Sequence, residues 1–313
     1  MECIVKMINF SVVIPLYNKE KEIIETIHSV MCQSYAPDEI IVVDDGSTDN
    51  GVNIIKENFQ DKIKLISQKN MGVSSARNRG ISEAKNEYIC LLDADDLWET
   101  GFLEEMEKLI KLFPEALFYS TSHKNIDERG EYLKSKLTFE ESYIGNIENF
   151  IDTFRKNYGL VNSSSVCIRK STKVIFPENE KRGEDICVWL TLSLRGEFAF
   201  SAKSLSVYRL NASNRSGQIH SEAIVPCQLQ WFYKNKNMLQ TYKYYKSIRF
   251  FIYSNIFITV YGGFALEKNH VSIDAVIDLM KKNGDWFYLI LYPAYFLPVR
   301  LLDQIKKIRR NLR

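Results

Sequence analysis

Several features that would assign this chain to a common protein class are scarce or missing. Its six cysteines include no C-x-x-C pair and its four histidines lack metal-ligand spacing, so a disulfide framework or a zinc centre is poorly supported. The net charge is only +2, from 41 basic and 39 acidic residues, which gives no reason to expect nucleic acid as a partner. Residues 1–9 are too short and too mixed for a signal peptide, which favours cytosolic synthesis.

Long apolar runs are also missing. Residues 250–266 carry no charge but include Asn255 and two adjacent glycines, and residues 286–299 hold two prolines. A bilayer-spanning helix needs about 20 apolar residues, so neither segment is expected to cross a membrane. Residues 286–299 are rich in aromatics and precede a basic cluster at 306–313, which is typical of a segment lying in the membrane interface. The alternative is a helical subdomain with a solvated basic end.

What the first part of the chain does contain is a regular alternation of two patterns. Short apolar runs predict strands at residues 10–15, 39–44, 62–68, 88–93 and 116–121. Amphipathic segments predict helices at residues 19–33, 48–59, 73–84 and 100–113. This alternation predicts an α/β fold with a Rossmann-like, mainly parallel sheet and flanking helices. Beyond residue 220 the composition becomes helical, aromatic and basic, so we expect a domain of residues 1–220 and a separate region of residues 221–313.

Polar side chains gather where three of the predicted strands end, at residues 15–18, 44–47 and 93–96. Ligands bind beyond the carboxyl ends of the strands in such sheets. Asp93, Asp95 and Asp96 follow one strand directly, and carboxylates so close together favour a hard cation such as Mg²⁺ or Mn²⁺. On an extended chain Asp93 and Asp95 would share one side. The alternative is an acidic cluster that only opens a helix.

Three further sets of residues are candidates. Asp45 could hydrogen-bond a nucleobase or ribose, or it could belong to a ligand-free Asx turn. Arg77 and Arg79 open a predicted helix where a phosphate could bind, although a solvated helix face would look the same. Glu184 and Asp185 open another helix, and a carboxylate there could deprotonate an acceptor hydroxyl or simply cap the helix.

Taken together, four motifs resemble family 2 glycosyltransferases of the GT-A fold. They are SVVIPLYN at residues 11–18, IVVDDGSTD at 41–49, NMGVSSARNRG at 70–80 and LLDADD at 91–96. Each motif is weak alone, but the series in this order and spacing is specific. The Glu184-Asp185 pair followed by Trp189 extends the resemblance, whereas residues beyond 221 carry no strong family motif.

The resemblance implies a role for each matching residue. Pro15, Tyr17 and Asn18 would line the nucleotide pocket, with Tyr17 stacking on the base, and Asp45 would hydrogen-bond that base, expected to be uracil. Arg77 would lie near the base and the diphosphate, Asp93 and Ala94 would contact the ribose or sugar, and Asp95 would ligate the metal, Mn²⁺ or Mg²⁺. Asp185 would be the general base, with Glu184 and Trp189 on the acceptor side.

The implied activity is an inverting transfer of a sugar from a nucleotide-sugar donor, first of all a UDP-sugar, to an acceptor hydroxyl. The donor would bind residues 1–121 and the acceptor residues 122–220. A lipid-linked glycan of surface polysaccharide biosynthesis would suit the aromatic, basic tail and a peripheral position on the inner face of the cell membrane. Family members often carry a histidine after the last strand, but Asn211 stands here, which leaves the third metal ligand open.

Two other functions are compatible with part of the pattern. A nucleotidyltransferase also uses paired acids, but it would need a phosphate-binding loop after the first strand, which residues 15–18 do not provide. A non-catalytic nucleotide-sugar-binding scaffold would be expected to lack Asp95 or Asp185, and both are present. A processive synthase would need several long transmembrane spans.

Overall fold

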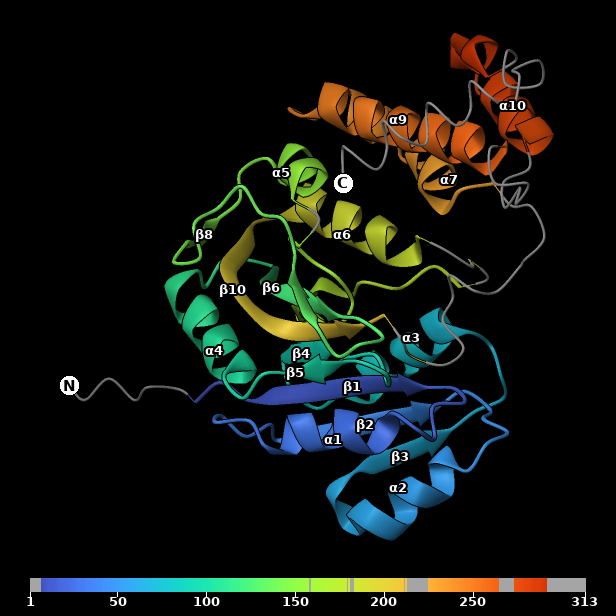
Figure 1. The fold of residues 1–313 in the computed structure, drawn as a ribbon. Helices are drawn as coiled ribbons and strands as arrows, with labels where there is room; N and C mark the ends of the chain where they lie inside the picture. Colours follow the sequence, from blue (N-terminus) through green and yellow to red (C-terminus); the bar gives the residue numbers. More distant parts are fainter. Residues whose placement is uncertain are drawn as a thin grey trace. The chain divides into compact units, whose positions relative to one another are not determined.

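The computed structural model describes residues 7–157, 159–178, 180, 183–210, 212, 225–264 and 273–291. The chain divides into two compact units, residues 1–215 and 216–313. The predicted boundary at residue 220 lies outside the described residues. Figure 1 shows the helices and strands of both units.

The first unit contains one mixed sheet with helices packed against it. Its strands are β1 (Phe10–Leu16), β2 (Glu39–Asp44), β3 (Lys64–Ser67), β4 (Tyr88–Leu91), β5 (Leu97–Trp98), β6 (Phe118–Ile126), β7 (Tyr132–Lys134), β8 (Ile144–Asn146), β9 (Val166–Arg169) and β10 (Phe198–Arg209). Its helices are α1 (Ile23–Met31), α2 (Gly51–Phe59), η1 (Gln60–Lys62), α3 (Val73–Glu83), α4 (Phe102–Leu112), α5 (Phe150–Lys156), η2 (Lys170–Thr172) and α6 (Glu184–Arg195).

The strand order corrects one part of the prediction. The main path runs β3-β2-β1-β4-β9-β6-β10-β5, and only the β3-β2-β1-β4 end is wholly parallel. Strand β9 is antiparallel to both β4 and β6, and β10 is antiparallel to β5 and β8. The sheet is therefore mixed rather than mainly parallel. The short runs that form β5, β7 and β8 have no distinct apolar pattern, so their pairing could not be read from the sequence.

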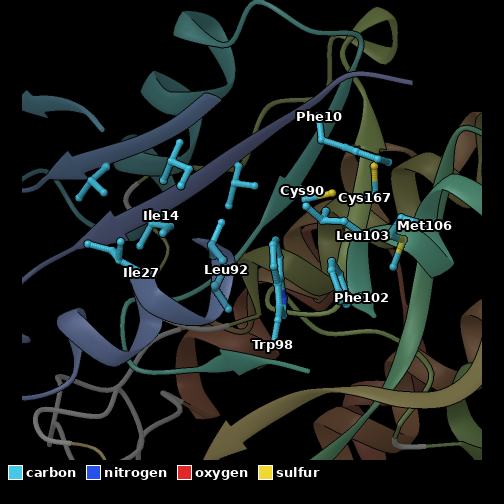
Figure 2. Packing of buried hydrophobic residues seen from close by; sticks show 14 of the residues in the cluster. Phe10, Ile14, Ile27, Cys90, Leu92, Trp98, Phe102, Leu103, Met106 and Cys167 are labelled. Carbon is cyan, nitrogen blue, oxygen red and sulfur yellow. The ribbon is translucent and has the colours of Figure 1, made fainter. Parts of the chain in front are cut away.

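Helices cover both faces of the parallel end, as its apolar strands predict. Alternate residues of β1, from Phe10 to Leu16, join a core cluster with side chains of α1, α2 and α4 (Figure 2). Val13 points to the opposite face, where α3 crosses at Gly80. A Cβ atom at Gly80 would lie 2.2 Å from Val13 Cγ1, so glycine is required for this approach. The close contact fixes α3, which carries Arg77, against the strand that leads to Tyr17.

Two buried cysteines in this core remain free thiols. Cys90 of β4 lies opposite Cys167 of β9, and burial raises the pKa of the Cys90 thiol. Cys187 is also buried, in agreement with the apolar patterns around it, whereas Cys32 is exposed because it lies just past the end of α1.

The second unit is helical, as its composition predicts. Its described elements are α7 (Cys227–Lys234), α8 (Lys236–Gln240), α9 (Tyr245–Phe264), α10 (Ile273–Lys282) and η3 (Trp286–Ile290). Asp285 accepts hydrogen bonds from the phenols of Tyr233 and Tyr253, which ties α7 and α9 to the turn before η3. Within the described ranges, none of the helices is both long and apolar enough to cross a membrane. The basic cluster at residues 306–313 lies outside the described residues.

Candidate active site

Three strand ends meet at one edge of the parallel sheet. Strand β1 lies between β2 and β4 and is parallel to both, so the segments that follow these strands adjoin. The amide of Asp45 donates to the carbonyl of Leu16 at 2.8 Å, and the amide of Leu92 donates to that of Val13 at 3.1 Å. This arrangement brings together the motifs around Tyr17, Asp45 and Asp93, which the sequence placed far apart.

Asn18 fixes the segment after β1 to the segment after β2. Its backbone has a φ of 51°, and its amide donates to Ser47 Oγ at 3.1 Å. Its side-chain oxygen accepts from the amide of Thr48 at 2.7 Å. Pro15 is buried within β1, whereas Tyr17 is 42% exposed just beyond it. Tyr17 therefore has a free ring surface at the predicted nucleobase position, and base stacking stays a prediction.

Asp45 is buried and organises the loop that leads into α3. Its carboxylate accepts from the amides of Met71 and Gly72 at 2.9 and 2.8 Å, and from Gln68 Nε2 at 2.9 Å. Gly46 turns the chain beside this loop with a φ of 75°. A carboxylate can accept about four hydrogen bonds, so capacity remains for a ligand. Recognition of a nucleobase by Asp45 stays a prediction.

Arg77 links two carboxylates that are distant in sequence. Its guanidinium donates to Asp93 Oδ1 at 2.8 Å and to Glu184 Oε1 at 3.0 Å, and it lies 5.3 Å from the centre of the Phe176 ring. Burial disfavours its charged form, but attraction to Asp93 and Glu184 outweighs this and raises the pKa of Arg77. Its buried Nε has no hydrogen-bond partner in the structure. Arg79 does not join the site, because its side chain is largely exposed and pairs with Glu83 at 2.9 Å.

The acids after β4 turn instead of continuing as an extended chain. The amide of Asp96 donates to the carbonyl of Asp93 at 3.0 Å, which forms a tight turn. The predicted reason for Asp93 and Asp95 to share a side, alternation along a strand, is therefore wrong, because a turn replaces the strand there. Ala94 is buried in this turn, and its carbonyl accepts from Thr26 Oγ1 at 2.9 Å.

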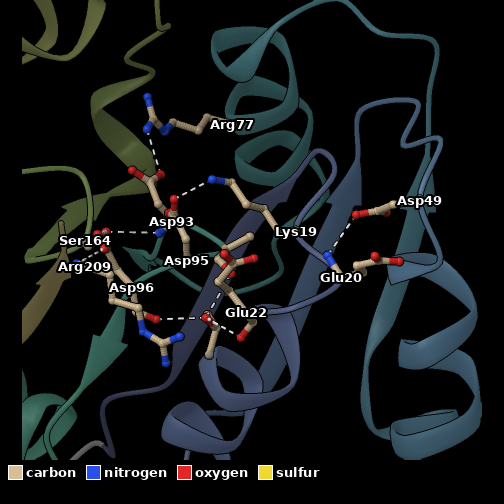
Figure 3. Close-up of polar contacts among 12 residues, drawn as sticks. Lys19, Glu20, Glu22, Asp49, Arg77, Asp93, Asp95, Asp96, Ser164 and Arg209 are labelled. Atoms are coloured by element: carbon tan, nitrogen blue, oxygen red, sulfur yellow. Dashed lines mark hydrogen bonds and ion pairs between the residues drawn. The ribbon is translucent and has the colours of Figure 1, made fainter. Parts of the chain in front are cut away.

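The three acids have different partners, as Figure 3 shows. Asp93 pairs with Arg77, and Asp95 Oδ2 lies 2.6 Å from Lys19 Nζ. Asp96 is fully buried and accepts from Ser164 Oγ at 2.5 Å and from the amide of Arg209 at 3.1 Å. Burial raises the pKa of Asp96 well above its usual range, and the charges of Asp95 and Asp93 act in the same direction. Asp96 thus anchors the turn to β10.

Glu184 and Asp185 form the first turn of α6. Glu184 is held by Arg77, while Asp185 accepts from the amide of Ile186 at 2.8 Å through Oδ1. Burial and the charge of Glu184 raise the pKa of Asp185, Arg77 opposes both, and the resulting pKa is about 6. A carboxyl with a pKa near neutrality is suited to general-base catalysis.

Trp189 lies one turn further along α6, in the core. Its ring is 1% exposed, stacks on Phe118 at 6.3 Å and meets Phe176 edge-on at 6.0 Å. It packs beneath Arg77 through Phe176 and presents almost no surface to solvent. A place for Trp189 on the acceptor side stays a prediction. Asn211 lies outside the described residues.

Sequence reasoning missed Lys19 and Ser164. Lys19 was expected to begin a helix, but α1 begins at Ile23 and the preceding turn directs Lys19 to Asp95. Ser164 lies just before β9, and its hydroxyl also accepts from the amide of Asp93 at 3.1 Å. The sequence did offer a signal for Lys19, because it directly follows the asparagine of the first motif. It offered none for Ser164, which is remote from every motif.

The donor set fits the implied Mn²⁺ or Mg²⁺. Asp95 provides hard carboxylate oxygens. Burial raises the pKa of Asp95, the charge of Lys19 lowers it, and the charge of Asp93 raises it. Within the described ranges, no three His, Cys, Asp or Glu side chains gather closely enough to hold a metal by themselves. Mg²⁺ commonly binds one or two carboxylates and completes its shell with substrate phosphates and water. Asp95 could therefore hold such an ion together with a nucleotide.

Comparison with known proteins identifies the class to which this fold and site belong. Residues 11–176 match the model of glycosyl transferase family 2, and the chain belongs to that family. An uncharacterised glycosyltransferase of Rickettsia bellii is 35% identical over 208 residues, which cover 65% of this chain and 29% of that protein. The chain thus spans about a third of the length of the Rickettsia relatives it matches.

Two relatives with assigned pathways are also similar. The amylovoran biosynthesis glycosyltransferase AmsB of Erwinia amylovora is 29% identical over 77% of this chain and 84% of its own length. The putative teichuronic acid biosynthesis glycosyltransferase TuaG of Bacillus subtilis is 30% identical over 64% of this chain and 78% of its own length.

A solved structure confirms the GT-A fold. The crystal structure of residues 1–349 of S. aureus TarS in complex with UDP-GlcNAc superimposes with a TM-score of 0.72 at 18% identity. The match covers 97% of this chain and 92% of that one. The likeness supports the overall architecture, while the membrane-associating role of the C-terminal region is a separate proposal.

Proposed function

We propose that this chain transfers a sugar from a UDP-sugar to an acceptor hydroxyl with inversion at the anomeric carbon. The observation that carries the proposal is the double ion pair of Arg77. Arg77 pairs with Asp93, at the predicted donor side, and with Glu184, which lies 107 residues after Arg77 in the sequence and next to the candidate base Asp185. The acids after β4 and the proposed base on α6 would then act at one site.

The proposed reaction uses these groups in order. Asp185 accepts the proton of the acceptor hydroxyl, and the acceptor oxygen attacks the anomeric carbon from the side opposite the diphosphate. The bond between that carbon and the phosphate oxygen breaks, and its electron pair leaves with UDP. Arg77 offsets negative charge on the leaving nucleotide through the positive charge of its guanidinium. A metal held by Asp95 would supply further positive charge at the diphosphate.

Donor binding would use the exposed ring of Tyr17, the turn at Asn18 and the spare acceptor capacity of Asp45 for the base. Pro15 would shape the floor beneath them, and Asp93 and Ala94 would contact the ribose or sugar. UDP is favoured because a TarS structure that shares the fold was solved with UDP-GlcNAc.

We propose a lipid-linked glycan of surface polysaccharide biosynthesis as the acceptor. AmsB and TuaG are named for amylovoran and teichuronic acid biosynthesis, which supports a polysaccharide pathway. Such an acceptor would place the protein at the inner face of the cell membrane, with the C-terminal region in contact with lipid. The family match does not favour a nucleotidyltransferase, and the presence of both Asp95 and Asp185 argues against a non-catalytic scaffold.

The first test is thermal melting with UDP, GDP, CMP and dTDP, each with Mn²⁺ or with a chelator. A ligand at 100 times its dissociation constant should stabilise the fold by about 2.7 kcal/mol. We expect UDP to raise the melting temperature with Mn²⁺, and Asp95→Ala to lose this metal-dependent shift. A folded protein that responds to no nucleotide, or an Asp95→Ala variant with unchanged donor affinity, would contradict the proposal.

A further inference from the structure

Lys19 occupies an unusual place in the candidate site. It follows Asn18, whose left-handed backbone turns the chain away from β1. The carbonyl of Lys19 accepts a hydrogen bond from the amide of Ile23 at 3.0 Å, where α1 begins. Its side chain is only 11% exposed, and its Nζ lies 2.6 Å from Asp95 Oδ2, whose side chain is 17% exposed. Figure 3 shows the ammonium reaching across from the β1 side to the turn after β4.

The partner of Asp95 differs in kind from the partners of its neighbours. Asp93 is held by the planar guanidinium of buried Arg77 on α3, and Asp96 by the hydroxyl of Ser164 and the backbone amide of Arg209 on β10. Asp95 is instead held by a compact ammonium on a flexible four-carbon chain. Among the three acids it therefore has the partner most easily exchanged without moving the backbone.

We propose that Lys19 serves as the counter-ion of Asp95 in the nucleotide-free protein, releases it when a divalent cation binds with the nucleotide, and then pairs with the diphosphate. This inference rests on the proposed function. An ammonium and a divalent cation on the same carboxylate repel each other, so binding of the cation at Asp95 favours release of Lys19. The diphosphate supplies the negative charge that a displaced ammonium requires.

The exchange has two opposite consequences for binding. Without nucleotide, Lys19 competes with the metal for Asp95 and weakens metal binding. With nucleotide, the same charge lies beside the diphosphate and strengthens nucleotide binding. A merely structural ion pair would show neither of these paired effects, since its loss would only lower the stability of the fold.

The test compares Lys19→Met with Lys21→Met, a matched control on the exposed side of the same turn. Free Mn²⁺ is measured by electron paramagnetic resonance without nucleotide, and UDP affinity is measured by calorimetry with saturating Mn²⁺. For Lys19→Met we expect roughly tenfold tighter Mn²⁺ binding without nucleotide, which corresponds to about 1.4 kcal/mol, and severalfold weaker UDP binding. Lys21→Met should match the wild type in both, and adding Asp95→Asn to Lys19→Met should abolish the gain in Mn²⁺ affinity.

The outcomes separate this proposal from the one it rests on. If wild-type protein binds UDP with Mn²⁺ but Lys19→Met changes neither affinity, the exchange is wrong and the function stands. If Lys19→Met weakens UDP binding without strengthening Mn²⁺ binding, competition for Asp95 is also wrong. If wild-type protein binds no nucleotide, the proposed function fails first. Circular dichroism verifies that each variant is folded, and Lys19→Arg, which keeps the charge, should retain more UDP affinity than Lys19→Met.

Discussion

The proposed general base, Asp185, shows how neighbouring charges set the pKa of one buried carboxyl. Burial and the adjacent Glu184 both disfavour its ionised form, while Arg77 favours it, and the result is a pKa of about 6. An exposed aspartate would be a weaker proton acceptor, because its usual pKa is near 3.9. The guanidinium of Arg77 limits how far burial and Glu184 raise the pKa of Asp185, so the Asp185 carboxyl is mostly ionised at neutral pH.

We expect Asp185→Asn to retain UDP binding but to lose sugar transfer by about 10²-fold or more, because the amide cannot accept the acceptor proton. The measurement is transfer rate under single turnover, with UDP affinity determined in parallel. Asp152→Asn, on the surface of α5, is the matched control. Transfer that survives in Asp185→Asn would show that another group is the base.

The pH dependence follows from the same pKa. Asp185 must be ionised to accept a proton, so kcat/KM should fall about tenfold per pH unit below pH 6 and level off above it. Because Glu184 raises the pKa of Asp185, Glu184→Gln should move the acidic fall in kcat/KM to lower pH. If this fall stays at the same pH or moves to higher pH, Asp185 is not the group that titrates.

At the scale of elements, the contact between α3 and β1 positions the site. Helix α3 carries Arg77 and follows the loop held by Asp45, while β1 ends at Tyr17. Gly80 lets the two elements approach, since any Cβ there would meet Val13. A small displacement of α3 would move the guanidinium relative to Asp93 and Glu184.

We expect Gly80→Ala to destabilise the fold by about 1–2 kcal/mol. Alanine normally improves a helix by about 1 kcal/mol, but overpacking costs about 1–3 kcal/mol and a 2.2 Å approach leaves the backbone no room. Urea unfolding measures the difference. In a Val13→Ala background the added methyl has space, so Gly80→Ala should become neutral or stabilising there. A loss of equal size in both backgrounds would show that the contact with Val13 is not the cause.

For the molecule as a whole, the second unit offers an apolar surface with basic neighbours. Trp286 is 74% exposed and Leu289 51% exposed on η3, and α10 ends with Lys281 and Lys282. Exposed aromatic and aliphatic side chains beside lysines suit the interface of an anionic membrane. This surface is where the proposed contact with lipid would be centred.

We expect the protein to co-sediment with vesicles that contain anionic phosphatidylglycerol and to bind less at high salt. The double variant Trp286→Ala/Leu289→Ala should reduce this binding severalfold, because both side chains would leave the lipid interface. Met238→Ala, which removes from α8 a side chain as exposed as Leu289, is the control. If the wild type and both variants bind equally, lipid contact is not centred on Trp286 and Leu289. If the wild type does not bind, the proposed lipid contact is wrong for these vesicles.

The sequence by itself determined the family, the α/β class and most strand and helix positions, because apolar periodicity and four ordered motifs are local signals. It also identified Asp93, Asp95, Arg77 and Asp185 as candidates. Only the tertiary structure decided that the sheet is mixed, that Arg77 joins Asp93 to Glu184, and that Lys19 pairs with Asp95. Arg77 and Glu184 alone are 107 residues apart, and strand pairing and buried ion pairs depend on which surfaces meet when the chain folds.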